Sequence, residues 1–332
     1  MPRGTSVSSP DVQAQPPSLQ LSLSRVGVTE VEKIVRIRQD DAEQLFSARL
    51  QCFVDLGRNQ KGAHMSRFEE VVNEAIGEVV LGEATFKAEA LAQRVAELVR
   101  DRQGAERAEV TVAARYPEHK PAPVSGVPTQ EIYTLYGSAV ASARGTRRLT
   151  GVAAQGITAC PCAQQLVKGA SRERLEQDGF SDDEIERIFE HVPVATHNQR
   201  GLGTLHIGVP EGAGTEIDAR TLLDIVEGSM SSEIYELMKR FDEAAVVEKA
   251  HRRPRFVEDC VREMIGGVIE MLPDRSGEHF VSARQENLES IHQHNVVAER
   301  FGLLGELRHE LATGEHAGRG MTMREWLDAA GR

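Results

Sequence analysis

Apolar and polar residues alternate along some stretches of the chain and recur at helical spacing along others. The clearest alternation runs from Phe46 to Val54, where every second residue is apolar, which is the period of a half-buried strand. Cys52 lies on the apolar face of that strand and is therefore predicted to belong to the core. A looser alternation from Leu19 to Ile37 predicts a strand before it.

Two helices and two further strands are predicted after these strands. The helices are indicated by apolar residues at helical spacing, namely Val71, Val72, Ala75, Ile76, Val79 and Val80, and then Phe86, Ala90, Leu91, Val95, Leu98 and Val99. Alternation around Val110 to Ala114 and Ile132 to Tyr136 predicts the strands, with a Pro-rich loop from His119 to Pro128 between them.

The second half repeats this order. The elements expected there are a strand at Thr150 to Gly156, a polar helical insert at 163–196 with a capping box from Ser181 to Glu184, a strand at Leu205 to Val209, a helix from Leu222 to Arg240, a helix opened by Pro254, and strands at His279 to Gln285 and His292 to Glu299. Two halves with one element order predict a duplicated α+β unit, although no residue-level repeat is strong enough to prove it.

Four regions follow from this pattern. Residues 1–18 are rich in Pro, Ser and Gln and are predicted to be a disordered tail. A first module is expected over 19–145 and a second over 146–312, the latter containing the insert, and residues 313–332 are predicted to be a C-terminal tail.

Charge and cysteine content narrow the class of protein. The net charge of −12 argues against a protein whose main partner is a nucleic acid or an anionic membrane. The four cysteines are too few and too irregular for a disulfide framework, which favours a reducing cytoplasm. No apolar run approaches the roughly 20 residues that cross a bilayer, and the N-terminus lacks the apolar core of a signal peptide.

Candidate chemistry is concentrated between Gly156 and Arg200. Cys160 and Cys162 lie two residues apart around Pro161, where they would share one face if extended, and His197 follows the insert. Thiolate and imidazole are the ligands that zinc and ferrous iron prefer, so an open metal site is one interpretation. Buried structural cysteines and a hydrogen-bonded loop histidine are the other.

Other polar residues also carry two interpretations. Glu243 follows Lys239, Arg240 and Asp242 and equally fits a solvated run of charges. Glu258 lies off the apolar stripe of its helix and faces either water or a cleft. The segment Lys61 to Phe68 fits a polar loop with Ser66 capping the next helix. On the last predicted strand, His292 and His294 share one face, where they could bind metal or phosphate or transfer protons.

Eight of these segments together resemble the type IB GTP cyclohydrolases. They are DVQ (11–13), SRVGV (24–28), KGAHMSRF (61–68), TACPCAQ (158–164), THNQRG (196–201), SSEIYELMKRFDE (231–243), RFVEDCVREM (255–264) and ESIHQHN (289–295). The likeness covers nearly the whole chain after the tail, in order. It implies two tandem tunnelling-fold modules per chain, each an antiparallel sheet with paired helices, in a homo-oligomer that is a dimer or a tetramer.

The resemblance also implies roles for individual residues. Cys160, His197 and Glu243 match the positions that hold a divalent metal in this family, with Fe(2+) favoured and Zn(2+) or Mn(2+) as alternatives. Substrate-binding residues are expected at Glu258, which would hold the guanine edge, and at His64, Arg67 and Arg200. Catalytic roles are expected for Cys160, for Cys162 as a proton donor, and for His292 and His294, although Cys162 equally fits a structural thiol.

The implied activity is ring opening of GTP with loss of formate, giving a dihydroneopterin phosphate for pterin cofactor biosynthesis. The 34 residues between Cys162 and His197 resemble the archaeal MptA-type branch, whose product is a 2′,3′-cyclic phosphate. The alternatives are the bacterial type, which releases dihydroneopterin triphosphate for folate, a nitrile reductase of the same superfamily, and a non-catalytic nucleotide-binding scaffold. A zinc deaminase is disfavoured because its H-x-E and P-C-x-x-C spacings are absent.

Overall fold

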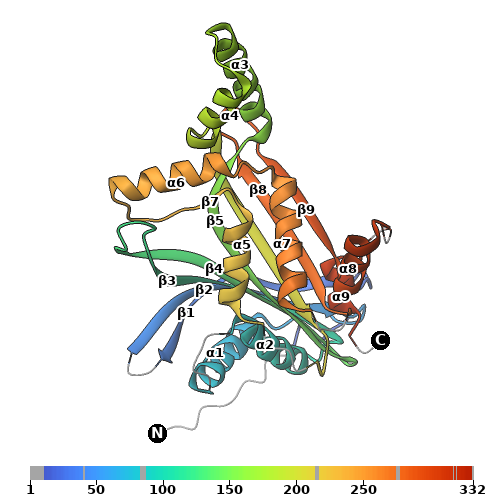
Figure 1. Ribbon diagram of the computed structural model, residues 1–332. Coiled ribbons are helices and arrows are strands. Elements are labelled where there is room, and N and C mark those ends of the chain that lie inside the picture. The colour runs from blue at the N-terminus through green and yellow to red at the C-terminus, as the bar shows by residue number, and fades with distance from the viewer. Residues whose placement is uncertain are drawn as a thin grey trace. The chain divides into compact units, whose positions relative to one another are not determined.

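The structure, a computed structural model, describes residues 11–39, 42–82, 87–213, 217–273, 277–316, 318 and 320–330. Residues 1–10 of the predicted tail and Phe86 lie outside them. The described part contains nine strands and nine helices, so the α+β prediction is confirmed (Figure 1). None of the helices in these ranges is both long enough and apolar enough to cross a lipid bilayer.

The chain divides into two compact units. The first comprises Met1–Ala113, Gly137–Arg148 and Leu327–Arg332, and the second comprises Ala114–Tyr136 and Leu149–Trp326. Strands are hydrogen-bonded in the order β1-β2-β3-β4-β5-β6-β8-β9, and the short β7 pairs with β5. Since β3, β4 and β5 each contribute residues to both units, the division does not fall at one place in the sequence. The module boundary predicted between residues 145 and 146 falls at the beginning of β5.

The first half of the chain forms the elements that the pattern predicts. They are β1 (Leu23–Gln39), β2 (Ala42–Leu56), α1 (Met65–Gly82), α2 (Ala88–Gln103), β3 (Arg107–Pro121) and β4 (Pro128–Ser142). Strands β1 and β2 pair antiparallel with Val28 opposite Cys52, and the apolar face of β2 is buried, Cys52 included. Helix α1 begins at Met65, so Ser66 lies inside its first turn and is not its cap.

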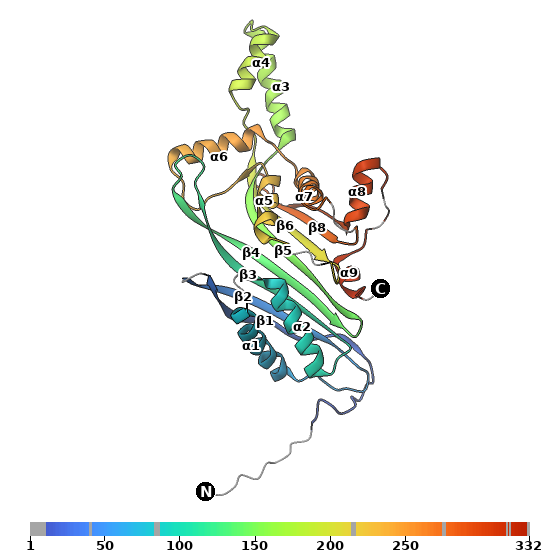
Figure 2. The ribbon, with the colours of Figure 1, turned by 60° about the horizontal axis from the view of Figure 1, so that its bottom comes forward.

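The second half repeats this order of strands and helices and has further elements inserted between them. Its elements are β5 (Gly145–Ala159), α3 (Pro161–Gln177), α4 (Asp182–His191), β6 (Asn198–Val209), α5 (Ala219–Ser229), β7 (Ser232–Glu233), α6 (Arg240–Arg252), α7 (Val257–Met271), β8 (Phe280–Leu288), β9 (Val296–Leu303), α8 (Leu304–Thr313) and α9 (Met323–Asp328). Helices α5 and α7 lie against one face of β6, β8 and β9, whereas the α3–α4 hairpin extends away from them (Figures 1 and 2).

The predicted helix from Leu222 to Arg240 is wrong, because α5 ends at Ser229. Tertiary hydrogen bonds replace the helical ones beyond that point. Ser232 and Glu233 pair with β5, and the Glu236 amide donates to the Glu131 carboxylate at 2.8 Å. Helix α6 then starts anew at Arg240, and the capping box predicted at Ser181 and Glu184 of α4 is confirmed.

Four other local predictions need correction. Cys160 and Cys162 are not on one extended face, because Pro161 opens α3 and places Cys162 in its first turn. His292 and His294 precede β9, which begins at Val296, and so lie in a loop. Pro254 precedes α7, whose N-cap is Phe256. The segment after residue 313 contains α9, whose Trp326 is buried with its ring 6.0 Å from that of Phe280.

A half-buried histidine on β6 is expected to make stability depend on pH. The His206 ring centroid lies 5.4 Å from that of Tyr136, and a Cβ added at Gly151 would come within 2.2 Å of the His206 ring. Burial lowers the pKa of His206 to about 4. The unfolded chain, with a histidine pKa near 6.5, therefore binds more protons between these values, so the free energy of unfolding falls as pH falls through that window.

We expect a loss of about 1–3 kcal/mol between pH 7 and pH 4 from this group, since one pKa unit corresponds to about 1.4 kcal/mol and the residue is not fully enclosed. Urea unfolding of the parent and of His206→Leu at both pH values measures the effect. The variant should lose less stability on acidification than the parent does. Equal losses in the two proteins would show that the environment of His206 in the folded protein does not disfavour its charged form.

Candidate active site

The segments around Cys160 and His197 lie side by side where β5 ends and β6 begins. The Cys160 amide donates to the His197 carbonyl at 3.1 Å, and the Thr196 hydroxyl donates to the Cys160 carbonyl at 2.9 Å. Cys160 is the N-cap of α3, where its Sγ accepts from the Ala163 amide at 3.5 Å. The insert of helices α3 and α4 thus returns the chain to its starting point and brings these two residues together.

Buried polar partners hold the His197 ring. Its Nδ1 lies 3.1 Å from Gln199 Oε1, and Gln199 Nε2 donates to Thr158 Oγ1 at 3.1 Å. Since an amide oxygen accepts, this arrangement places the proton on Nδ1 and leaves Nε2 free to bind a metal. Glu289 Oε2 also lies on the Nδ1 side at 3.9 Å.

Glu289 is a residue of this site that was not predicted from the sequence. Its side chain is almost buried, with 7% exposed beside His197. The available signal was its position three residues before His292 in the ESIH segment. A carboxylate behind the ring of a metal-binding histidine fixes the ring and raises its basicity.

The two later histidines lie close to this pair. His292 and His294 are exposed in the loop before β9, and their rings stack with centroids 5.1 Å apart. The His197 and His292 ring centroids are 6.4 Å apart at an edge-on angle. The structure therefore brings together four of the predicted residues: Cys160, His197, His292 and His294.

Glu243 lies elsewhere in the same chain. Its helix, α6, meets the site at its other end, where His251 Nε2 lies 3.2 Å from the Thr196 carbonyl. Glu243 and His251 are eight positions apart in this helix, which corresponds to about 12 Å along the axis. Among the described residues, no group of three or more His, Cys, Asp and Glu side chains is placed to hold a metal ion.

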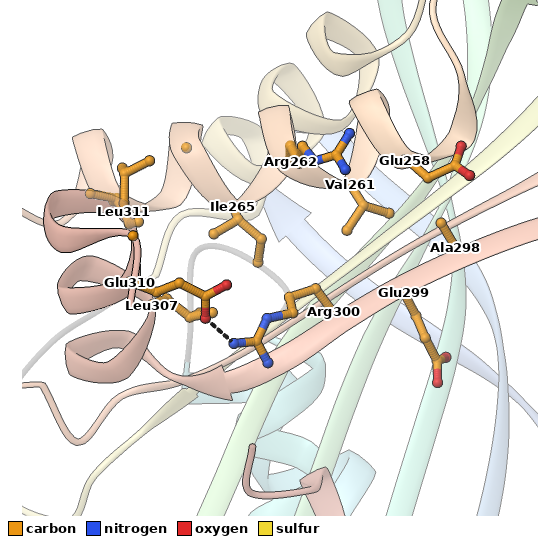
Figure 3. A pocket seen from close by; sticks show the side chains of 13 residues that line it. Glu258, Val261, Arg262, Ile265, Ala298, Glu299, Arg300, Leu307, Glu310 and Leu311 are labelled. Carbon is orange, nitrogen blue, oxygen red and sulfur yellow. Dashed lines mark hydrogen bonds and ion pairs between the residues drawn. The ribbon is translucent and has the colours of Figure 1, made fainter. Parts of the chain in front are cut away.

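Glu258 lies at one end of a groove between α7, β9 and α8, with Leu311 at the other end (Figure 3). The groove has a volume of about 570 Å³. The Arg255 amide, three residues before Glu258, donates to the carbonyl of Ala159 at 2.9 Å. Because of this contact, the helix that carries Glu258 begins beside Cys160.

The remaining predicted residues are placed as follows. Arg200 is exposed and donates to Gln155 Oε1 at 3.0 Å, and Cys162 is exposed in the first turn of α3. In the first unit, Gln103 fixes the His64 backbone with hydrogen bonds of 3.2 and 2.8 Å, and Arg67 donates to the Arg102 carbonyl at 3.0 Å.

Asp11 and Gln13, in the predicted disordered tail, also contact the loop that contains His64. Asp11 Oδ2 lies 3.4 Å from His64 Nε2. The Gln13 carbonyl accepts from the amides of Lys61 and Gly62 at 3.0 and 3.2 Å. This part of the predicted tail is therefore ordered against the loop that follows β2.

The other two cysteines are unsuited to metal binding. Burial raises the pKa of the Cys52 thiol to about 12, with a smaller contribution from Glu69, and burial raises the pKa of Cys260 to about 12 as well. A protonated thiol is a poor ligand. Cys160 and Cys162 are thus the cysteines with accessible chemistry.

A family model described as type I GTP cyclohydrolase folE2 matches residues 9–298. The chain belongs to this family. It is 42% identical over 310 residues to the GTP cyclohydrolase MptA of Methanococcus aeolicus, and the matched residues cover 91% of this chain and 99% of that protein. It is 39% identical to the MptA of Methanocaldococcus jannaschii over 92% of this chain and 98% of that one.

Among solved structures, the crystal structure of a hyper-thermostable AgUricase mutant resembles this chain with a TM-score of 0.50. The two sequences are 9% identical, and the superposition covers 92% of this chain and 96% of the AgUricase chain. At that identity the likeness is one of fold alone. The family match favours the cyclohydrolase interpretation over the nitrile reductase alternative.

Proposed function

We propose that this protein is a metal-dependent GTP cyclohydrolase of the MptA type. It opens the imidazole ring of the guanine of GTP, releases formate, and closes the opened ribose into 7,8-dihydroneopterin 2′,3′-cyclic phosphate, with diphosphate as the other product. The family match supports the substrate. The observation that carries the chemistry is the pairing of Cys160 with His197, whose Nε2 is left free by the contact to Gln199.

The donor set fits a divalent metal. Cys160 supplies sulfur and His197 supplies nitrogen, which suit Zn(2+) or Fe(2+), and Fe(2+) is the favoured ion. Glu243 is the proposed third ligand. Because it lies about 12 Å along α6 from the residue that contacts Thr196, we assign it to the site of a second copy of the chain in a homo-oligomer.

A metal held there would lower the pKa of a bound water and supply a nucleophile for C8 of the guanine. The protein's own groups would orient the base and move protons. Glu258 accepts from guanine N1–H and the 2-amino group, which adenine cannot match. His292 and His294 exchange protons with the opening ring, Cys162 is a candidate donor, and His64, Arg67 and Arg200 are assigned to the substrate's polar groups.

We also propose that the chain consists of two tandem tunnelling-fold modules. The order β1, β2, α1, α2, β3, β4 is repeated by β5, β6, α5, α7, β8, β9. The second copy of this order carries two inserts, α3–α4 and β7–α6. The described cysteines are all free thiols, in keeping with a cytoplasmic protein whose ligand cysteine must stay reduced.

Anaerobic incubation with GTP and Fe(2+) tests the reaction. We expect equimolar formate and diphosphate, and a pterin product with a single phosphate on phosphate-sensitive chromatography. A pterin that retains three phosphates would assign the protein to the bacterial reaction type. Absence of formate from protein loaded with metal would contradict the cyclohydrolase proposal itself.

A further inference from the structure

Buried carboxylates link the end of α5, the non-helical segment that follows it and the start of α6 to strands β3 and β4 and their turn. Glu227 accepts from Lys120 Nζ at 2.7 Å and from the Tyr133 hydroxyl at 2.9 Å. Glu131 accepts from the Glu236 amide at 2.8 Å. Both carboxylates belong to residues less than one-tenth exposed. The third, Asp242, lies where the segment becomes α6.

Asp242 is fully buried and joins two separate pieces of backbone. Its Oδ1 accepts from the amides of Val124 and Ser125, both at 2.8 Å. Its Oδ2 accepts from the Ser125 hydroxyl at 2.6 Å and from the Lys239 amide at 2.8 Å. One carboxylate thus caps α6 and holds the turn between β3 and β4, and the start of α6 lies beside that turn in both views (Figures 1 and 2).

The adjacent residue, Glu243, is exposed instead. Its carboxylate has no hydrogen-bond or ion-pair partner among the described residues. Phe241, which precedes Asp242 in the sequence, is 78% exposed. The first turn of α6 therefore presents a free carboxylate and an exposed aromatic ring, while Asp242 between them is anchored in the protein.

We propose that Asp242 is a positioning residue, which fixes the first turn of α6 to the β3–β4 turn so that Glu243 is held where a second chain's Cys160 and His197 require it. This rests on the proposed function, in which Glu243 is a metal ligand. A metal ligand must be held within about 0.5 Å of its place. The first turn of a helix frays when its amides lack acceptors, and Asp242 supplies such an acceptor.

The other end of α6 is held independently. His251 contacts the Thr196 carbonyl, and Gln164 Nε2 donates to the His251 carbonyl at 2.6 Å. Lys249 Nζ contacts Glu233 Oε2 at 2.5 Å. Loss of Asp242 should therefore loosen Glu243 while the last turns of α6, and the Cys160–His197 pair beside them, stay in place.

The test compares Asp242→Asn with Glu131→Gln in the full-length oligomer. Both substitutions remove a buried carboxylate that contacts the chain between α5 and the first turn of α6. Glu131 accepts from the Glu236 amide, however, and does not cap α6. The amide that Asp242→Asn introduces has one acceptor oxygen, so it cannot accept both from the Val124 and Ser125 amides, as Oδ1 does, and from the Lys239 amide, as Oδ2 does. We expect Asp242→Asn to weaken Co(2+) and Zn(2+) affinity about 10- to 100-fold, the range for residues that orient metal ligands, and Glu131→Gln to change it less than about 3-fold.

Chelator competition gives the affinities, and the visible absorption of bound Co(2+) reports its coordination. Hydrogen exchange at Val124 and Ser125 should accelerate in Asp242→Asn alone. Equal losses of affinity in the two variants would overturn the positioning role, because general destabilisation would then explain both.

A third variant, Glu243→Gln, separates the two proposals. If it loses metal and Asp242→Asn does not, the positioning role is overturned and the ligand assignment stands. If Glu243→Gln keeps full affinity, the ligand assignment fails and the positioning role fails with it.

Discussion

Replacing Cys160 by alanine is expected to abolish bound metal and to lower formate release from GTP at least about 1000-fold. A metal contributes several kcal/mol to the transition state, and about 1.4 kcal/mol corresponds to tenfold in rate. In the proposed site, Cys160 would supply the sulfur donor next to His197, to which its backbone is hydrogen-bonded. Cys52 and Cys260 are buried and cannot substitute for it, whereas Cys162 is exposed in the first turn of α3.

Cys260→Ala is the matched control for this loss. It also removes one thiol from the second unit, but that thiol is buried on α7 and protonated, with a pKa raised by burial to about 12. We expect this variant to keep its metal and at least about half of its turnover, with a modest loss of stability. Anaerobic metal analysis and formate release are measured on the same samples. Full metal in Cys160→Ala would show that the ligand assignment is wrong.

Replacing Glu258 by glutamine is expected to lower kcat/KM for GTP by about 10²- to 10⁴-fold, in the range seen when a site loses a paired polar contact to its substrate. A carboxylate accepts from both guanine N1–H and the 2-amino group, whereas a glutamine amide presents one acceptor and one donor to the same edge. The exposed Glu258 carboxylate has no partner among the residues described, which leaves it available to a ligand.

Inosine triphosphate separates base recognition from a general loss of activity, because it lacks the 2-amino group. The parent should prefer GTP over inosine triphosphate strongly, and Glu258→Gln should lose most of that preference. Glu299→Gln provides a control, since Glu299 lines the same groove without facing the start of α7 (Figure 3). An unchanged preference in Glu258→Gln would remove Glu258 from the guanine site.

Most strands and helices follow from local pattern. The alternation from Phe46 to Val54 predicted β2 because every second residue there is apolar and is buried in one face of a sheet. The helix predicted from Leu222 to Arg240 failed at Ser229 because distant acceptors, such as Glu131, capture the amides of the next segment. Glu131 is 105 residues from Glu236 in the sequence, so a helical period cannot reveal it.

The site was predictable to a similar extent. A metal site was one interpretation of Cys160, Cys162 and His197, and the structure brings Cys160 and His197 together. The spacing did not reveal that Pro161 opens α3, which places Cys162 in the first turn of a helix and not on one extended face with Cys160. The run from Lys239 to Glu243 gave no sign of which acid is buried. Asp242 is enclosed and Glu243 is exposed because the β3–β4 turn, from another part of the chain, supplies the donors.

The central claim is that Cys160 and His197 of one chain and Glu243 of another hold one metal. Co-expression of Cys160→Ala and Glu243→Gln chains with different tags, followed by tandem purification, tests it most directly. Each variant alone should be inactive and free of metal, whereas the mixed oligomer contains sites with all three ligands intact. The account predicts that the mixed oligomer recovers metal and formate release, and a mixed oligomer as inactive as its parents would contradict it.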